Sequence, residues 1–309
     1  MLRRFAWGVL AFTLFVIVWG TFVRATGSGA GCGSHWPTCN GEVIPRPETV
    51  ETAIEFTHRA TSGLSFILVA AMMIAALRLR PKGHPMRRAA VLSFVFMITE
   101  SAVGAGLVLL EYVADDRSPA RAIWVAVHLI NTFLLVASIA LAARQSGEDA
   151  RPLRWRPIGI WVLLAAAAVL FVATAGAVTA LGDTLFPARS LAEGVAADFS
   201  PTAHFLIRLR IYHPLSAMGA SVLITAVALI VGLRVPGARK PAMTLIALFF
   251  LQIGGGLVNL FLLAPVWMQL VHLALADAVW IALVLLGVEA FGTPRAARAG
   301  GNSGRSARS

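Results

Sequence analysis

The chain has 309 residues, of which 58% are hydrophobic and 13% are charged, and its formal net charge is +11. A soluble domain would have about twice that charged fraction, and a basic nucleic-acid-binding protein would gather its Arg and Lys residues on one soluble face. The composition therefore excludes both classes, and we expect the lipid bilayer as a partner and no nucleic acid.

Eight apolar spans follow one another along the chain, each close to the roughly 20 residues that a helix needs to cross a bilayer. They cover residues 5–23, 54–77, 89–110, 122–143, 158–181, 207–233, 242–263 and 266–290. This pattern predicts an all-α polytopic membrane protein with eight transmembrane helices. The first span follows Arg3 and Arg4 as a signal peptide would, but its apolar core is too long and no cleavage pattern of small residues follows. We expect it to stay as a helix.

The positions of the basic residues predict the orientation. If the N-terminus is cytoplasmic, the cytoplasmic segments hold 18 of the 26 basic residues, as the positive-inside rule requires. Both termini are then cytoplasmic. The tail, 292–309, is rich in Gly, Ser, Arg and Ala, and we expect it to be disordered.

The two halves of the chain resemble each other, and we predict two tandem, pseudo-symmetric four-helix bundles, 1–147 and 148–291. The correspondences are Glu100 and Gly104 with Gln252 and Gly256, Val-His-Leu around His128 with the same tripeptide around His272, and Gly20 with Gly176. We expect the small residues of spans three and seven to let neighbouring backbones approach closely.

Four of the seven histidines lie inside spans, and all four belong to even-numbered spans. They are His58, His128, His213 and His272. At 1.5 Å per residue their positions correspond to about 6–10 Å below the outer edge. Two imidazoles at one depth on parallel helices are the layout for bis-histidine ligation of one haem in each half. Interhelical hydrogen bonds and a zinc site are the alternatives.

Glu55 precedes His58 by three residues, so it lies on the same helical face, one turn toward the surface. A carboxylate there could accept a proton, orient water or stabilise positive charge beside a haem. The alternative is an interfacial ion pair with Arg59. Arg210 takes the corresponding place before His213, so only the first half has this acid. Four arginines near the outer face are candidates for pairing with haem propionates: Arg24, Arg59, Arg208 and Arg210.

The remaining polar features allow two readings each. Cys32 and Cys39 are the only cysteines and lie in the first outer loop. An oxidising exterior permits a disulfide between them, either as a structural crosslink or as a redox-active pair. Glu100 and Asp277, within spans three and eight, suit either a proton path or a buried pair. His204, just before span six, is a weaker candidate for contact with a cofactor.

Several of these motifs resemble the haem A synthase family, in its bacterial, cysteine-containing form. The resemblance rests on residues 23–29 (Val-Arg-Ala-Thr-Gly-Ser-Gly), 36–41 (Trp-Pro-Thr-Cys-Asn-Gly) and 55–59 (Glu-Phe-Thr-His-Arg), and it extends through the other three histidines. It implies that a methyl group of haem O is oxidised to a formyl group by successive hydroxylations, which yields haem A.

The resemblance also implies a role for each of the candidate site residues. The substrate haem would lie between His58 and His128, a haem b cofactor between His213 and His272, and Glu55 would be the catalytic acid. It further implies a bacterial plasma membrane, an electron acceptor, and haem O synthase and cytochrome oxidase assembly proteins as candidate partners. A homo-oligomer is compatible with it.

The sequence departs from the family pattern in three places. Residues 182–206 hold no second cysteine pair, and Glu100 replaces a glutamine. Pro214 follows His213 where the family usually has arginine, and we expect it to loosen the helix after that histidine. Two other functions stay open: a cytochrome b electron-transfer subunit, and a quinone-coupled thiol–disulfide oxidoreductase that uses Cys32 and Cys39.

Overall fold

A computed structural model describes residues 1–46, 48–147 and 149–293. Its helices are α1 (Leu2–Ala25), η1 (Ser28–Ala30, a 3-10 helix), α2 (Val50–Leu79), α3 (Pro85–Leu109), α4 (Pro119–Arg144), α5 (Gly159–Leu185), α6 (Leu191–Asp198), α7 (Phe205–Arg208), α8 (Tyr212–Arg234), α9 (Arg239–Phe261) and α10 (Val266–Phe291). Eight segments of this described part are long and apolar enough to cross a membrane, α7 and α8 together forming one of them. The predicted all-α polytopic fold is confirmed. The predicted disordered tail lies outside the described residues from 294 onward.

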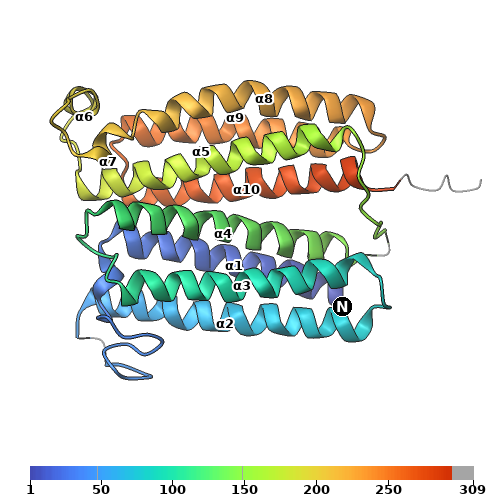
Figure 1. The fold of residues 1–309 in the computed structure, drawn as a ribbon, viewed down its shortest axis with the longest axis horizontal. Helices are drawn as coiled ribbons and strands as arrows, with labels where there is room; N and C mark the ends of the chain where they lie inside the picture. Colours follow the sequence, from blue (N-terminus) through green and yellow to red (C-terminus); the bar gives the residue numbers. More distant parts are fainter. Residues whose placement is uncertain (47, 148, 294–309) are drawn as a thin grey trace, which may run out of the picture.

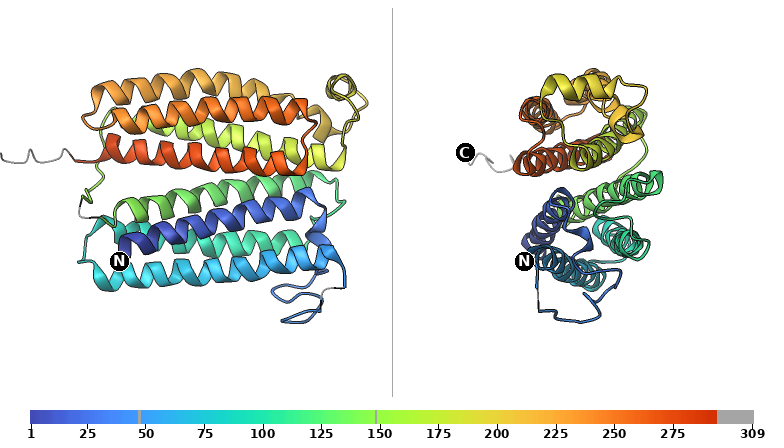
Figure 2. Two further views of the ribbon diagram at one scale, coloured as in Figure 1. Left: turned by 180° about the vertical axis from the view of Figure 1, so that it is seen from behind. Right: turned by 90° about the vertical axis from the view of Figure 1, so that its left-hand side faces the viewer.

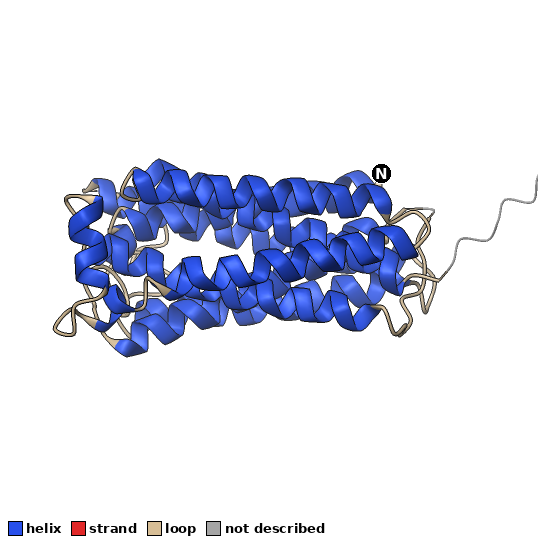
Figure 3. Cartoon of the chain, turned by 90° about the horizontal axis from the view of Figure 1, so that it is seen from above, coloured by secondary structure: helices blue, strands red, loops and turns tan. Residues whose placement is uncertain are grey.

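The long helices form two groups that lie side by side, α1–α4 in one and α5 with α8–α10 in the other (Figures 1 and 2). All of them run roughly along one axis, so the connections collect at the two ends of the molecule (Figure 3). The N-terminus and the end of α10 lie at one end, and residues 26–46 lie with α6 and α7 at the other, which we call the loop end. The helices that carry the four histidines all start at the loop end.

Caps and prolines determine where several of these helices begin. The Thr49 side chain accepts a hydrogen bond from the backbone N–H of Thr52, and the Ser118 side chain does the same for Arg121. Pro119 is the first residue of α4, where a missing N–H leaves no intrahelical bond unmade. These signals start α2 and α4 earlier than the hydropathy pattern predicted.

The predicted sixth span, 207–233, is interrupted. A single turn, α7, ends at Arg208, and α8 begins at Tyr212. Pro214 therefore lies in the first turn of α8, where its missing N–H is not needed. The prediction that Pro214 would loosen the helix after His213 was wrong, because the helix starts immediately before the histidine.

The two helix groups meet through α1 and α4 on one side and α5 and α10 on the other. At the centre of this interface, Trp280 of α10 stacks on Phe133 of α4 with 5.5 Å between the ring centroids. The indole N–H of Trp280 donates to the backbone carbonyl of Phe133 at 2.6 Å, and both side chains are buried. Away from the loop end, Arg151 of the connecting segment pairs with Glu289 of α10 at 2.6 Å.

Trp280→Phe should lower the Tm of the purified protein in detergent. The change removes the hydrogen bond to the Phe133 carbonyl and leaves space beside its ring, which together cost about 1–3 kcal/mol. Trp267→Phe is the matched control, because Trp267 lies on the same helix and is 58% exposed. Equal Tm shifts for the two variants would contradict a role for Trp280 in holding the groups together.

Candidate functional site

The four intramembrane histidines lie at one level near the loop end. His58 is eight residues after the first residue of α2 and His272 is six after that of α10. His128 is nine residues after the first residue of α4, whereas His213 is the second residue of α8. At 1.5 Å per residue, His58, His128 and His272 lie about 9–14 Å along their helices. His58 and His128 are deeper than the sequence predicted because α2 and α4 begin earlier, whereas α10 begins at the predicted residue.

Each of these histidine rings lies against a glycine on the preceding long helix. The pairs are Gly20–His58, Gly104–His128, Gly176–His213 and Gly256–His272. A Cβ atom added at Gly176 would lie 2.8 Å from Cε1 of His213. The loosest pair is Gly104–His128, where the added Cβ would lie 3.9 Å from Cε1 of His128. The comparison of the two halves of the sequence identified these glycines. For spans three and seven, however, we expected small residues to let neighbouring helix backbones approach closely. The imidazole rings occupy that space instead.

In the second half, the rings of His213 and His272 lie nearly perpendicular to each other, at 82°, with centroids 6.2 Å apart. Two imidazoles that each bind one metal ion through a nitrogen at about 2 Å have ring centres about 6 Å apart. Nδ1 of His213 lies 3.1 Å from the carbonyl oxygen of Val172, which leaves Nε2 as the nitrogen for a metal. The spacing fits bis-histidine ligation of a haem iron.

In the first half, His58 lies against Gly20 of α1 and His128 lies near Gly104 of α3. Nδ1 of His58, Nδ1 of His128 and Nδ1 of His272 are all buried without a hydrogen-bond partner among the described residues. Buried polar atoms normally have partners, so these nitrogens indicate a group to be bound. No cluster of three His, Cys, Asp or Glu side chains in the described residues could hold a bare metal ion. Imidazole pairs with iron between them remain the arrangement that fits.

The Glu55 carboxylate lies under the first loop and is 3% exposed. One oxygen accepts the backbone N–H of Cys32 at 2.8 Å, and the other accepts two bonds from the Arg59 guanidinium, at 2.5 Å and 3.1 Å. The ion pair considered from the sequence is therefore present. It orients the carboxylate one turn above His58.

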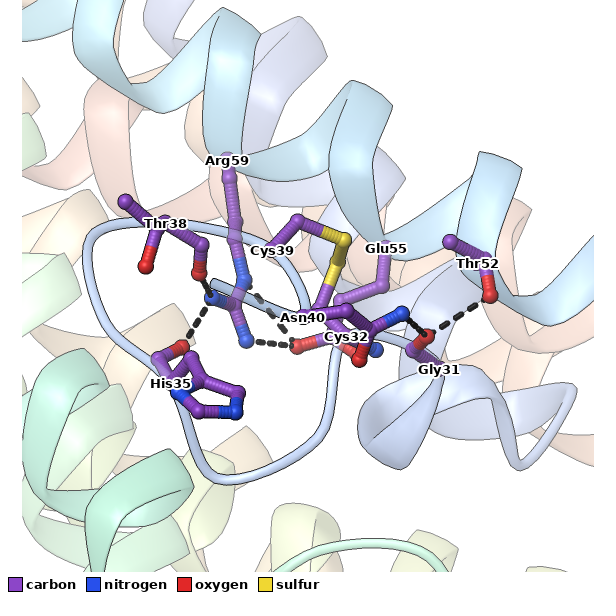
Figure 4. A network of polar contacts seen from close by, with 9 residues as sticks. All are labelled: Gly31, Cys32, His35, Thr38, Cys39, Asn40, Thr52, Glu55 and Arg59. Atoms are coloured by element: carbon purple, nitrogen blue, oxygen red, sulfur yellow. Dashed lines mark hydrogen bonds and ion pairs between the residues drawn. A yellow bond between two sulfur atoms is a disulfide. The ribbon is translucent and has the colours of Figure 1, made fainter. Parts of the chain in front are cut away.

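Arg59 also donates to the carbonyl oxygens of His35 and Thr38, which lie between the two cysteines (Figure 4). Cys32 and Cys39 form a disulfide. The loop is thus closed on itself covalently and attached to α2 through Arg59. This geometry favours a structural role for the disulfide.

The corresponding place in the second half holds the opposite charge. Arg210 lies between α7 and α8, and its guanidinium donates to Asp183 at 2.9 Å and to Asp198 at 3.0 Å. Burial raises the pKa of Asp198 and the neighbouring Arg210 opposes that shift. Arg210 is not on a continuous helix with His213, so the two do not share a helical face as Glu55 and His58 do.

The other two arginines that were predicted to pair with haem propionates are Arg24 and Arg208. Arg24, at the end of α1, donates to the carbonyl of Ala180, to Thr184 and to Gln269 at 2.7–2.8 Å. It therefore crosses from the first helix group to α5 and α10 of the second. Arg208 is exposed at the end of α7.

Three residues left open by the sequence have different surroundings. Oε1 of Glu100 lies 3.4 Å from Nδ1 of His128, a proximity that the sequence did not reveal. Nδ1 of His204 accepts the backbone N–H of Leu206 at 3.3 Å and so caps α7. Asp277 is buried, and within the described structure its carboxylate oxygens have no hydrogen-bond partner, so it does not form a pair with Glu100.

Comparison with known proteins supplies the family. Residues 3–284 match the model of the cytochrome oxidase assembly protein family, COX15-CtaA. The chain belongs to this family. As a member of it with eight apolar helices, the protein is a multi-pass membrane protein.

Relatives of this assembly-family chain have two different names. Proteins called "Protoheme IX farnesyltransferase" in two strains of Thermus thermophilus are each 50% identical over 294 residues, which is 94% of this chain and 48% of theirs. "Heme A synthase" of a Bacillus cereus strain is 42% identical over 96 residues, 31% of each chain. The chain spans about half the length of the Thermus relatives.

Gly20→Ala should reduce haem binding by the first half. Its Cβ would lie 2.9 Å from Cε1 of His58, so the ring must leave its place, and we expect at least about tenfold weaker binding there. The haem content of the purified protein, measured by its Soret absorption, checks this. Gly8→Ala on the same helix is the control, because nothing lies within 4 Å of that position. Normal haem content in Gly20→Ala would contradict the assignment of His58.

Proposed function

We propose that this protein is a haem A synthase, which oxidises a methyl group of haem O to a formyl group by successive hydroxylations. One observation carries the proposal: a chain of this family has two histidine pairs near the loop end, and the buried carboxylate of Glu55 lies one turn before the first histidine, where the second half has Arg210. A cytochrome b subunit that only transfers electrons would have no need for that difference.

We assign the substrate haem O to His58 and His128, and a haem b cofactor to His213 and His272. The free ring nitrogens described above support both assignments. When bound, haem b supplies one-electron redox chemistry. We propose that the electrons removed from the methyl group leave through the second half toward an electron acceptor.

Glu55 is the proposed proton-accepting group of the first half. Its position one turn from His58 places it toward the loop end of that site, and Arg59 holds the carboxylate in one orientation. The backbone N–H of Cys32 holds the second oxygen. Three fixed hydrogen bonds keep the group in place without help from the substrate, which is the preorganisation that acid–base catalysis requires.

The name of the Thermus relatives suggests a second candidate, farnesyl transfer to protohaem. This chain aligns with 48% of each of those proteins. The match to the assembly-protein family covers residues 3–284 of this chain. We therefore assign farnesyl transfer to the part of the relatives that does not align. An enzyme of that class makes a farnesylated haem, which is the substrate proposed here, so haem O synthase is a proposed partner.

The location and orientation follow from the same proposal. We place the protein in a bacterial plasma membrane with both termini cytoplasmic, so that the loop end faces outward. The disulfide lies at the loop end, as an oxidising exterior would allow. Its closed, Arg59-bound loop supports a structural rather than a thiol-exchanging role.

Glu55→Ala should retain both haems and stop haem A formation. Without the carboxylate, unconverted haem O or a hydroxylated intermediate should accumulate, which chromatography and mass analysis of the extracted pigment would detect. Glu51→Ala is the matched control, an exposed carboxylate one turn earlier on α2, and should make haem A normally. Full haem A production by Glu55→Ala would remove Glu55 from the mechanism, and farnesylation of protohaem by the wild type would favour the second candidate.

A further inference from the structure

In each half, a polar side chain of one helix reaches the histidine of the next helix. In the first half, Oε1 of Glu100 on α3 lies 3.4 Å from Nδ1 of His128 on α4. In the second, the amide nitrogen of Gln252 on α9 lies 3.3 Å from Nε2 of His272 on α10. The positions correspond, but one group is a carboxylate and the other a neutral amide, and they approach different ring nitrogens.

The Glu100 carboxylate is held in place by residues that follow His128 on α4. The Asn131 side-chain amide donates to one oxygen at 2.6 Å, and the Thr132 hydroxyl donates to the other. Asn131 is itself fixed, because Thr99 donates to its side-chain oxygen at 2.6 Å. The orientation of the carboxylate toward the imidazole is therefore built into the packing of α3 against α4.

A carboxylate near Nδ1 matters for a histidine that binds iron because it places a charge beside the ring. The 3.4 Å separation is not a hydrogen bond, since Nδ1 of His128 has no hydrogen-bond partner among the described residues. Negative charge at that distance stabilises the more oxidised iron on the imidazole, and the fixed carboxylate biases how the ring is oriented. Gln252 carries no charge and cannot stabilise the oxidised iron in this way. The two haem sites thus differ in charge next to a ligand as well as in Glu55.

We propose that Glu100 is a positioning residue that orients His128 and lowers the reduction potential of the first-half haem relative to the second-half haem. This rests on the proposed function, since it concerns haems held by the four histidines. A lower potential at the substrate site favours electron movement from the first half to the second, the direction that oxidation of the substrate requires.

The test is an optical redox titration of the protein purified from cells that supply haem O and haem b. Glu100→Gln keeps the size and hydrogen bonding of the side chain and removes its charge. A tenfold change in the preference for ferric over ferrous iron corresponds to about 59 mV, so the first-half midpoint should rise by about that amount. The second-half midpoint should not move, and a His213→Ala companion identifies which midpoint belongs to which half.

Two further variants make the result decisive. Glu111→Gln removes the same charge from an exposed position just after α3 and should leave both midpoints unchanged. Gln252→Glu should lower the second-half midpoint, and it tests the same effect if Glu100→Gln fails to fold. A merely structural role for Glu100 would reduce haem content or Tm without moving the potential.

The outcomes separate this inference from the proposed function. If the wild type binds haem and makes haem A while Glu100→Gln has unchanged midpoints, the inference is overturned and the function stands. An equal shift in Glu111→Gln also overturns it. A wild-type protein that binds no haem overturns both.

Discussion

The structure depends on how imidazoles are accommodated within hydrocarbon. A polar ring inside a membrane helix needs a partner, and each of the four histidines is placed against a glycine backbone at the same level of its bundle. The glycine allows the ring to approach the neighbouring backbone closely. The 6.2 Å separation of the His213 and His272 rings matches the spacing of two imidazoles on one iron. The helix starts, the glycines and the histidine level are therefore parts of one arrangement.

Much of this was accessible from the sequence, because the bilayer imposes a length on each span and a high cost on each buried charge. Hydropathy predicted all eight segments, and the i,i+4 spacing allowed the pair of Glu55 with Arg59 as an alternative to a role of Glu55 beside a haem. The interruption before α8 was not predictable, since Pro214 is compatible with a kink or with a helix start. The contacts of Arg24 were also beyond the sequence, because it does not say which faces of the two halves meet.

The two halves close the loop end by different chemistry. In the first half a disulfide closes the loop, and Arg59 attaches it to α2. The second half lacks a cysteine pair in this region, and Arg210 joins α5 to α6 through Asp183 and Asp198. These two ion pairs connect α5, α6 and the turn before α8 through one arginine, where the first half uses a covalent crosslink.

Corresponding positions show which features the two halves share and which they do not. Histidines, and the glycines that lie against them, occur in both. At the loop end, Glu55 is paired with Arg59 in the first half, whereas Arg210 is paired with two aspartates in the second. Beside a histidine, the carboxylate of Glu100 in the first half corresponds to the neutral amide of Gln252 in the second. This last difference places negative charge in the first half, where the proposed oxidation would remove electrons. A site that loses electrons is assisted by a nearby carboxylate, so the proposed direction of the reaction agrees with the charges beside the histidines.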